Sequence, residues 1–312
     1  MTTDASTSFA QRWWAYQQER FPLLAHGPLI AAFSFCAVSY SAHLRTGIAV
    51  MPSWPVLLVA FLSCLLFFAQ LRIADEFKDF EEDSRYRPYR AVPRGLVSLR
   101  SLGLVFSFAA VTQLILALLL NPEMILLLLI PWVYLFAMCY EFGVREWLKA
   151  RPITYLWTHM LIIPLVDLYA TGCDWLAAGH NAPQGLVWFL LASFFNGIVI
   201  ELGRKLRAPR DEEEGVVTYT VLWGTVRAPL VWLTMMLLTG LIALQAAALT
   251  QTVDLVIWPL AALWIFSAVV TLQTIRRADQ LRGFLFERLS GVWTLGLYLS
   301  LGALPLVIRP FS

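Results

Sequence analysis

The chain has 312 residues, of which 59% are hydrophobic and 14% are charged; its formal net charge is +2 and its mean hydropathy +0.67. An average soluble domain is about 45–50% apolar and about 25% charged, so this chain has too few polar residues to cover a soluble fold. The same composition excludes a disordered chain, a coiled coil, a collagen and a disulfide-rich scaffold. We therefore predict an all-α polytopic membrane protein, with one domain over residues 1–312.

The N-terminal segment 1–22 is aromatic, with Trp13, Trp14 and Tyr16. It is typical of a helix lying at the membrane interface, and no small-residue cleavage site follows it. Nine later stretches are apolar enough to cross a bilayer, whose core is about 30 Å thick and needs roughly 20 helical residues. They are 24–44, 54–74, 99–120, 123–140, 153–172, 186–203, 228–249, 254–275 and 289–308.

The basic residues predict the orientation of the chain, because loops rich in Lys and Arg stay in the cytoplasm. All of the 23 Lys and Arg residues except Arg45 and Arg309 fall on one side of a nine-span arrangement. The N-terminus and the loops 75–98 and 204–226 are therefore predicted to be cytoplasmic. We expect a bacterial inner membrane, since no organelle-targeting extension is visible.

The first of two acidic clusters follows the second span. Asp75, Asp79 and Asp83 recur every four residues, so a continuing helix would place them on one face. Like charges at this spacing repel each other unless a cation lies among them. Carboxylate oxygens suit Mg²⁺, which usually shares its ligand shell with substrate phosphates. The alternative is a solvated helix end, salt-bridged by Lys78 and the arginines that follow.

The second cluster follows the sixth span and combines carboxylates with cations. Glu201, Arg204 and Lys205 fall on one helical face, and Asp211 follows in the loop. Asn196 lies inside the span, where a polar side chain is expensive and usually faces a cavity or a partner. A carboxylate beside Arg and Lys can hold a metal ion and a diphosphate together. The alternative is an ordinary cytoplasmic loop with compensating acids.

These motifs resemble those of the UbiA-type intramembrane prenyltransferases, nine-helix enzymes with aspartate-rich motifs after helices two and six. The family's first motif, N-D-x-x-D-x-x-x-D, is matched by residues 75–83, and its R-P-L-P-x-G-like continuation by residues 90–95. The second motif ends in G-x-x-T, as residues 215–218 do, with Asp211 four residues earlier. The resemblance extends over essentially the whole chain in topology.

Other positions match less closely. Tyr140 and Arg145, at the end of the fourth span, resemble the family's Y-x-x-x-K/R segment. Asp75 stands where the family usually has Asn, and Arg207 stands where its second motif usually has another Asp. The chain therefore resembles a divergent member of the family.

The resemblance implies a UbiA-like bundle around a central apolar cavity and Mg²⁺-dependent transfer of a polyprenyl group from its diphosphate to an aromatic or quinone-precursor acceptor. The implied partners are a polyprenyl diphosphate, a hydrophobic or aromatic acceptor and the lipid bilayer, and not a nucleic acid. The implied metal ligands, all but the first also catalytic, are Asp75, Asp79, Asp83, Glu201 and Asp211. The implied diphosphate-binding residues are Arg87, Arg90, Tyr140, Arg145, Asn196, Arg204 and Lys205.

Three other functions fit parts of this pattern. One is a superfamily member that uses another donor, such as phosphoribosyl diphosphate, with a polyprenyl phosphate acceptor. Another is a non-catalytic relative that has lost a metal. The third is a transporter, because charges in membrane proteins often mark ion paths, although the spans are nearly free of charge except at Asp167. None of the four histidines, His159 among them, lies in either cluster, so we expect them to pack or to lie at the interface.

Overall fold

The computed structural model describes residues 8–213, 215–276 and 281–309, and these are nearly all helical. Eight of the described helices are long and apolar enough to cross a membrane. They are α2 (Leu23–Thr46), α3 (Trp54–Lys78), α5 (Leu99–Leu120), α8–α9 (Pro152–Trp175), α10 (Leu186–Arg204), α11 (Tyr219–Leu249), α12 (Val253–Arg276) and α13–α14 (Gly283–Ile308). A shorter apolar helix, α6 (Met124–Cys139), takes the fourth of the nine predicted positions. The predicted all-helical membrane fold is confirmed.

Two helices differ from the predicted spans at their motif-bearing ends. Helix α3 continues to Lys78, so the predicted loop 75–98 begins with helical residues. Helix α11 starts at Tyr219, before the expected residue 228, because the Thr218 side chain accepts a hydrogen bond from the Val221 N–H and caps the helix. Gly224 (φ 83°) then bends α11 within its first two turns.

Two spans are interrupted at prolines. Helix α8 ends at Met160 and α9 (Ile162–Trp175) follows, because Pro164 has no N–H to donate to the carbonyl of Met160. In the last span, α13 (Gly283–Tyr298) widens into a π-type turn, η4 (Leu299–Ala303), before α14 (Leu304–Ile308). Pro305 in α14 likewise lacks the N–H that would reach back to the preceding turn.

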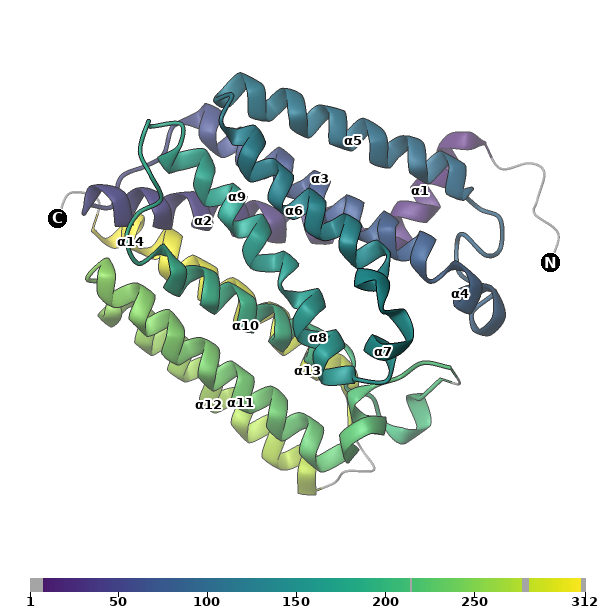
Figure 1. Ribbon diagram of the computed structural model, residues 1–312. Coiled ribbons are helices and arrows are strands. Elements are labelled where there is room, and N and C mark those ends of the chain that lie inside the picture. Colours follow the sequence, from purple (N-terminus) through teal and green to yellow (C-terminus); the bar gives the residue numbers. More distant parts are fainter. Residues whose placement is uncertain (1–7, 214, 277–280, 310–312) are drawn as a thin grey trace.

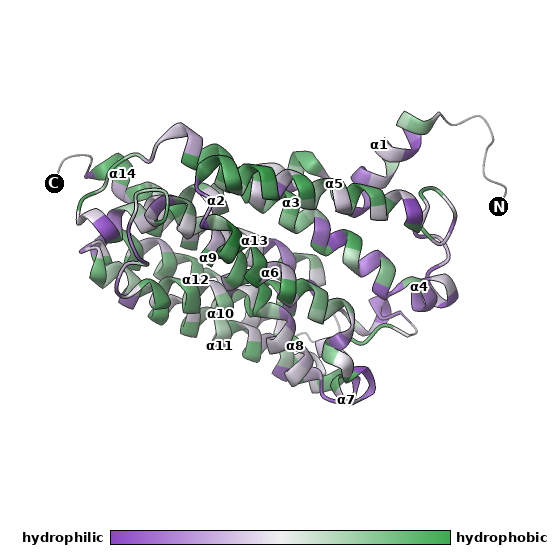
Figure 2. Ribbon diagram, turned by 45° about the horizontal axis from the view of Figure 1, so that its top comes forward, coloured by the Kyte–Doolittle hydropathy of each residue, from purple (hydrophilic) through white to green (hydrophobic). Residues whose placement is uncertain are grey.

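The helices lie side by side, and the connecting segments that carry the motifs share one end of the bundle (Figure 1). We call this the motif end; it holds α4 (Phe80–Tyr86), α7 (Arg145–Lys149) and the start of α8. Hydrophilic residues gather there, whereas the long helices are mostly hydrophobic (Figure 2). Helices α1 (Phe9–Arg20) and α14 lie at opposite ends, as an odd number of crossings requires.

Charges at the end opposite the motifs form pairs. Arg45 Nη2 lies 2.7 Å from Asp174 Oδ1, and Arg309 Nη2 lies 2.6 Å from Asp254 Oδ2. The two basic residues that the sequence places on this side therefore each have a carboxylate partner. Asp174 also accepts a hydrogen bond from the Ser41 hydroxyl (2.9 Å), which ties α9 to α2.

Helix α1 packs against the first motif loop. Tyr16 is 5% exposed and belongs to a small apolar cluster with Ile73 of α3 and Val92 of the loop. Arg20 forms an ion pair with Glu76, the residue next to Asp75. This N-terminal helix therefore fixes one side of the motif in addition to carrying interfacial aromatic residues.

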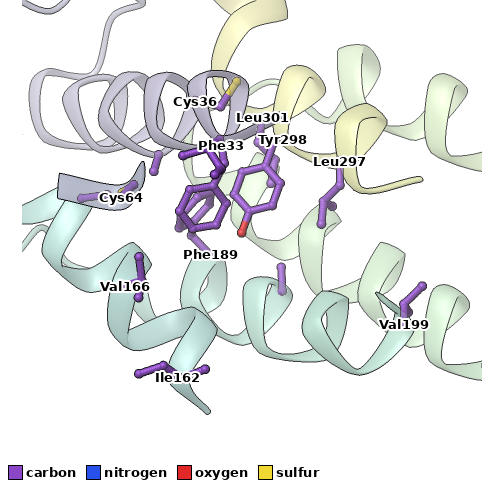
Figure 3. Packing of buried hydrophobic residues seen from close by; sticks show 14 of the residues in the cluster. Phe33, Cys36, Cys64, Ile162, Val166, Phe189, Val199, Leu297, Tyr298 and Leu301 are labelled. Atoms are coloured by element: carbon purple, nitrogen blue, oxygen red, sulfur yellow. The ribbon is translucent and has the colours of Figure 1, made fainter. Parts of the chain in front are cut away.

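Buried hydrophobic side chains pack together in the interior, with the aromatic rings of Phe33, Phe189 and Tyr298 among them (Figure 3). The rings of Phe33 and Phe189 pack on Tyr298, with centroids 4.9 and 5.8 Å away. The Tyr298 hydroxyl donates to Asp167 Oδ2 (2.6 Å), and the Ser193 hydroxyl donates to the same oxygen. Asp167, which the sequence places inside a predicted span, is thus fully buried and joins α9, α10 and α13.

Gly302 allows the last span to pack directly on the backbone of α2, and Gly302→Ala is expected to destabilise the protein by about 3 kcal/mol. A Cβ there would lie 2.4 Å from both the Cα and the carbonyl oxygen of Cys36, so backbone would have to move. Thermal unfolding in detergent measures the effect. Gly291→Ala on α13 is the control, because its Cβ would meet open space; equal melting temperatures for the two variants would contradict this packing.

Candidate functional site

The end of α3 carries the first acidic motif, and its neighbouring carboxylates face different partners. Asp75 lines a small pocket between α3 and α6, together with Leu71 and Leu135. Glu76 is 2% exposed and turns to α1, where it also contacts Arg72 (3.2 Å). Adjacent helical positions point about 100° apart, so only one of the pair can face the pocket.

Asp79 and Asp83 continue the helical ladder past the end of α3. The Asp79 N–H donates to the Asp75 carbonyl (2.9 Å) and the Asp83 N–H to the Asp79 carbonyl (2.8 Å), although Asp79 itself (φ −95°, ψ 4°) bends the chain between α3 and α4. Asp83 is 2% exposed and pairs with Arg87 and Arg90, each at 2.6 Å. These two predicted phosphate-binding arginines are therefore engaged with Asp83.

Asp79 makes no ion pair among the described residues. Burial raises its pKa to about 6 and the negative charge of Asp75 adds to this rise, while the positive charge of Lys78 opposes it. Among the described residues, Asp75 has one ionic contact, to Arg72 at 3.6 Å. Asp75 and Asp79 thus form a pair of carboxylates whose mutual repulsion a cation would relieve.

The end of α10 supplies a carboxylate bound to two cations. Glu201 is 8% exposed, with Arg204 Nη2 2.6 Å from one oxygen and Lys205 Nζ 2.8 Å from the other. Gly203, on another face of α10, packs so closely on α13 that a Cβ would lie 2.0 Å from the Ser290 hydroxyl oxygen. This contact fixes the helix end that presents the two cations.

The two motifs lie together at the motif end. Asp75 is within electrostatic range of both Glu201 and Arg204. The loops also touch: Gly215 (φ 76°) packs on the Tyr86 ring, which a Cβ would approach to 2.8 Å. The predicted G-x-x-T glycine therefore has a physical role, because a side chain there would separate the loops.

Most carboxylates of the second loop are satisfied within it. The Thr218 and Thr220 hydroxyls donate to Glu212 (2.7 and 2.8 Å), and Arg207 pairs with Glu213 (2.9 Å). Asp211 lies in the short turn η2 (Pro209–Asp211) and is exposed. Glu214, part of the same acidic run, lies outside the described residues.

A buried network that sequence patterns did not indicate borders Asp75. Lys78 Nζ donates to the Tyr155 hydroxyl (2.7 Å) and lies 3.2 Å from Glu141 Oε1; His159 Nε2 lies 3.2 Å from Glu141 Oε2. Burial raises the pKa of Glu141, but contact with His159 and the charge of Lys78 outweigh it and bring that pKa down to about 2. The expectation that His159 only packs is thus incomplete. The one feature of the sequence that could have indicated this network is Lys78, a basic residue inside the acidic run.

Comparison with known proteins agrees with this arrangement. The model of the UbiA prenyltransferase family matches residues 32–291. The chain belongs to this family. A solved structure of digeranylgeranylglyceryl phosphate synthase has the same fold, with a TM-score of 0.63 over 96% of this chain and 100% of that chain, at 13% identity. No curated protein matches the chain in sequence.

Within the UbiA fold, three other predicted site residues differ in exposure and in contacts. Asn196 is 1% exposed and accepts a hydrogen bond from Thr294 of α13 (3.2 Å), so it joins two helices. Tyr140 is 66% exposed. Arg145 approaches Glu82 (3.8 Å), and four residues separate it from Tyr140, one more than in the family's Y-x-x-x-K/R segment.

The UbiA family generally uses Mg²⁺, and the residues at the motif end fit one such ion. Among the described residues, no three His, Cys, Asp or Glu side chains converge on one point. Mg²⁺ is commonly held by one or two carboxylates, with substrate phosphates and water completing its shell. The Asp75–Asp79 pair matches that mode, whereas Glu201 is already bound by Arg204 and Lys205.

Proposed function

We propose that this UbiA-family protein transfers a polyprenyl group from its diphosphate to a hydrophobic or aromatic acceptor, in a reaction that requires Mg²⁺. The observation that carries this proposal is the pair of mutually repelling carboxylates, Asp75 and Asp79, at the end of α3 and within electrostatic range of Arg204. Opposite charges at one membrane-interface site are what a metal-bound diphosphate requires. Acids at helix ends also favour this function over transport, which places coupling residues near the midplane.

Different residues would stabilise the diphosphate as it leaves the prenyl group. The bond between the first prenyl carbon and the diphosphate oxygen breaks, its electron pair leaves with the diphosphate, and the acceptor bonds to the prenyl carbon. Asp75 and Asp79 would hold Mg²⁺, which when bound supplies positive charge to the leaving group. Arg204 and Lys205 would contact phosphate oxygens directly, so that charge developing on the diphosphate is met by fixed cations. The chemistry requires no nucleophilic side chain of the protein.

We further propose that a single Mg²⁺ suffices. The second motif has Arg207 in place of an Asp, and its remaining described carboxylates are either paired or exposed. Guanidinium and ammonium groups at Arg204 and Lys205 would supply the charge that another ion would otherwise bring.

The motif end would face the cytoplasm of a bacterial inner membrane. Nearly all Lys and Arg residues belong to that side, and such residues determine orientation when they lie close to the spans. The donor's charged head would then bind at the cytoplasmic surface while its apolar chain stays among the helices.

Metal removal gives the direct test. Purified protein with radiolabelled prenyl diphosphates and quinone-precursor acceptors is expected to form a labelled lipid, which EDTA abolishes and added Mg²⁺ restores. Product formation that is indifferent to EDTA would overturn the metal requirement. Transfer from labelled phosphoribosyl diphosphate to a polyprenyl phosphate, without transfer from prenyl diphosphates, would redirect the assignment to that donor.

A further inference from the structure

Lys78 stands inside the first acidic motif, where it would ordinarily neutralise its neighbours. On a helix, a Lys pairs readily with carboxylates three or four positions away, which here are Asp75, Glu81 and Glu82. Asp79 is its direct neighbour in the chain. A free ammonium at this position would therefore compete with any divalent cation for the same carboxylates.

In the structure the Lys78 ammonium contacts residues of other segments and not the carboxylates of its own helix. It bonds to the Tyr155 hydroxyl of α8 (2.7 Å) and pairs with Glu141 (3.2 Å), while Glu82 is taken by Lys149 of α7. Among the described residues, no ion pair joins Lys78 to Asp75 or Asp79, although Lys78 and Asp75 line the same pocket.

An unusual turn brings Glu141 to Lys78. Glu141 (φ 48°), Phe142 (φ 53°) and Gly143 (φ 74°) all have left-handed backbone conformations directly after α6. Such conformations cost on the order of 1–3 kcal/mol at a non-glycine residue, so they persist only where surrounding contacts enforce them. The turn leaves Tyr140 exposed and places Glu141 inside, 3% exposed.

The remaining partners fix Glu141 in place. The Tyr155 hydroxyl donates to Glu141 Oε1 (3.2 Å), and His159 stacks on the Tyr155 ring, with centroids 3.8 Å apart, while approaching Glu141 Oε2. His159 Nδ1 is in turn 2.9 Å from the Tyr155 carbonyl oxygen. Three side chains from two segments thus fix the position of the Lys78 ammonium group.

We propose that Glu141, supported by Tyr155 and His159, is a positioning residue that holds the Lys78 ammonium away from Asp75 and Asp79, so that this carboxylate pair stays available to a divalent cation. The inference rests on the proposed function for the identity of the cation site. The proposal gives a role to the turn after α6, which belongs to neither acidic motif.

Binding of Mn²⁺ alone, followed by the loss of its free-ion electron paramagnetic resonance signal, tests the proposal on the purified full chain in detergent. Glu141→Gln is expected to weaken Mn²⁺ binding about tenfold, because the released ammonium occupies the carboxylates. Lys78→Met alone is expected to change it by less than about twofold, and Glu141→Gln/Lys78→Met to return it to within about twofold of the wild type.

This double-mutant cycle separates positioning from simple charge. If Lys78 acted only through its field, Lys78→Met would tighten Mn²⁺ binding equally in both backgrounds, and that additive result would overturn the proposal. Tyr155→Phe removes one hydroxyl without changing charge and is expected to weaken binding in the same direction; it also serves if Glu141→Gln does not fold. Glu146→Gln, an exposed acid five residues along, is the matched control and is expected to leave binding unchanged.

Mn²⁺ binding distinguishes failure of the proposed cation site from failure of the positioning role. Wild-type protein that binds no Mn²⁺ would overturn the proposed cation site, and this inference with it. Wild-type binding that Glu141→Gln leaves unchanged would overturn the positioning role alone.

Discussion

Asp79→Asn is expected to lower kcat/KM for prenyl transfer by about 10²–10³-fold, because the amide removes one charge from the carboxylate pair that would hold the metal. The substitution preserves size, and Asp79 makes no ion pair among the described residues, so folding is expected to be unaffected. Initial rates with a radiolabelled prenyl diphosphate, on protein with unchanged melting temperature, measure the effect.

Substitution of Asp79 tests the metal site more specifically than substitution of Asp83 does. Removal of Asp83 would leave Arg87 and Arg90 without their 2.6 Å partner in a nearly buried position, so lost activity could reflect lost structure. Glu81→Gln, an exposed acid of α4, is the matched control and is expected to retain activity. Equal rates for Asp79→Asn and Glu81→Gln would remove Asp79 from the site.

Arg204→Gln is expected to lower kcat/KM for the prenyl diphosphate by about 100-fold, with the KM of the acceptor unchanged. The reason is that Arg204 would supply directly part of the charge that stabilises the leaving diphosphate. Glutamine keeps the hydrogen-bonding capacity but not the charge. Steady-state kinetics with each substrate varied in turn measure the two parameters separately.

The control for Arg204 lies in the same loop. Arg210 is exposed and its nearest carboxylate contact is 3.8 Å, so Arg210→Gln is expected to leave the kinetics unchanged. Added Mg²⁺ should not rescue Arg204→Gln if one ion suffices. Full rescue at high Mg²⁺ would instead indicate that a second ion can bind at the second motif.

The nine helices could be predicted from the sequence because a long apolar segment in lipid has few conformations other than a helix. In the hydrocarbon core each backbone N–H and C=O must be satisfied within the protein, and a helix does so locally. The extent of α5 was accordingly predicted to the residue. Interruptions such as the one at Leu161 were missed, since hydropathy does not register that Pro164 removes a backbone donor.

The acidic segments share one end of the bundle, as the sequence predicts, but sequence spacing left two interpretations of their carboxylates open. Asp75, Asp79 and Asp83 form one series, and the arginines that follow could have paired with any of them. The fold pairs Asp83 with Arg87, four residues further on, and with Arg90, and it leaves Asp79 without an ion pair among the described residues. Spacing within one helix does not decide between such partners, because it carries no information on what other segments bring to each carboxylate.

The order of apolar and charged segments alone determined that this chain crosses a membrane repeatedly and gathers two charged motifs at one end, because both properties follow from local composition. Only the tertiary structure decided which charged side chains pair with each other and which carboxylates stay without an ion pair among the described residues. Glu141 reaches Lys78 through a left-handed turn, and His159 joins them from a helix that hydropathy assigns to the membrane. Such pairings depend on long-range packing, in which segments distant in sequence determine the electrostatic surroundings of each carboxylate.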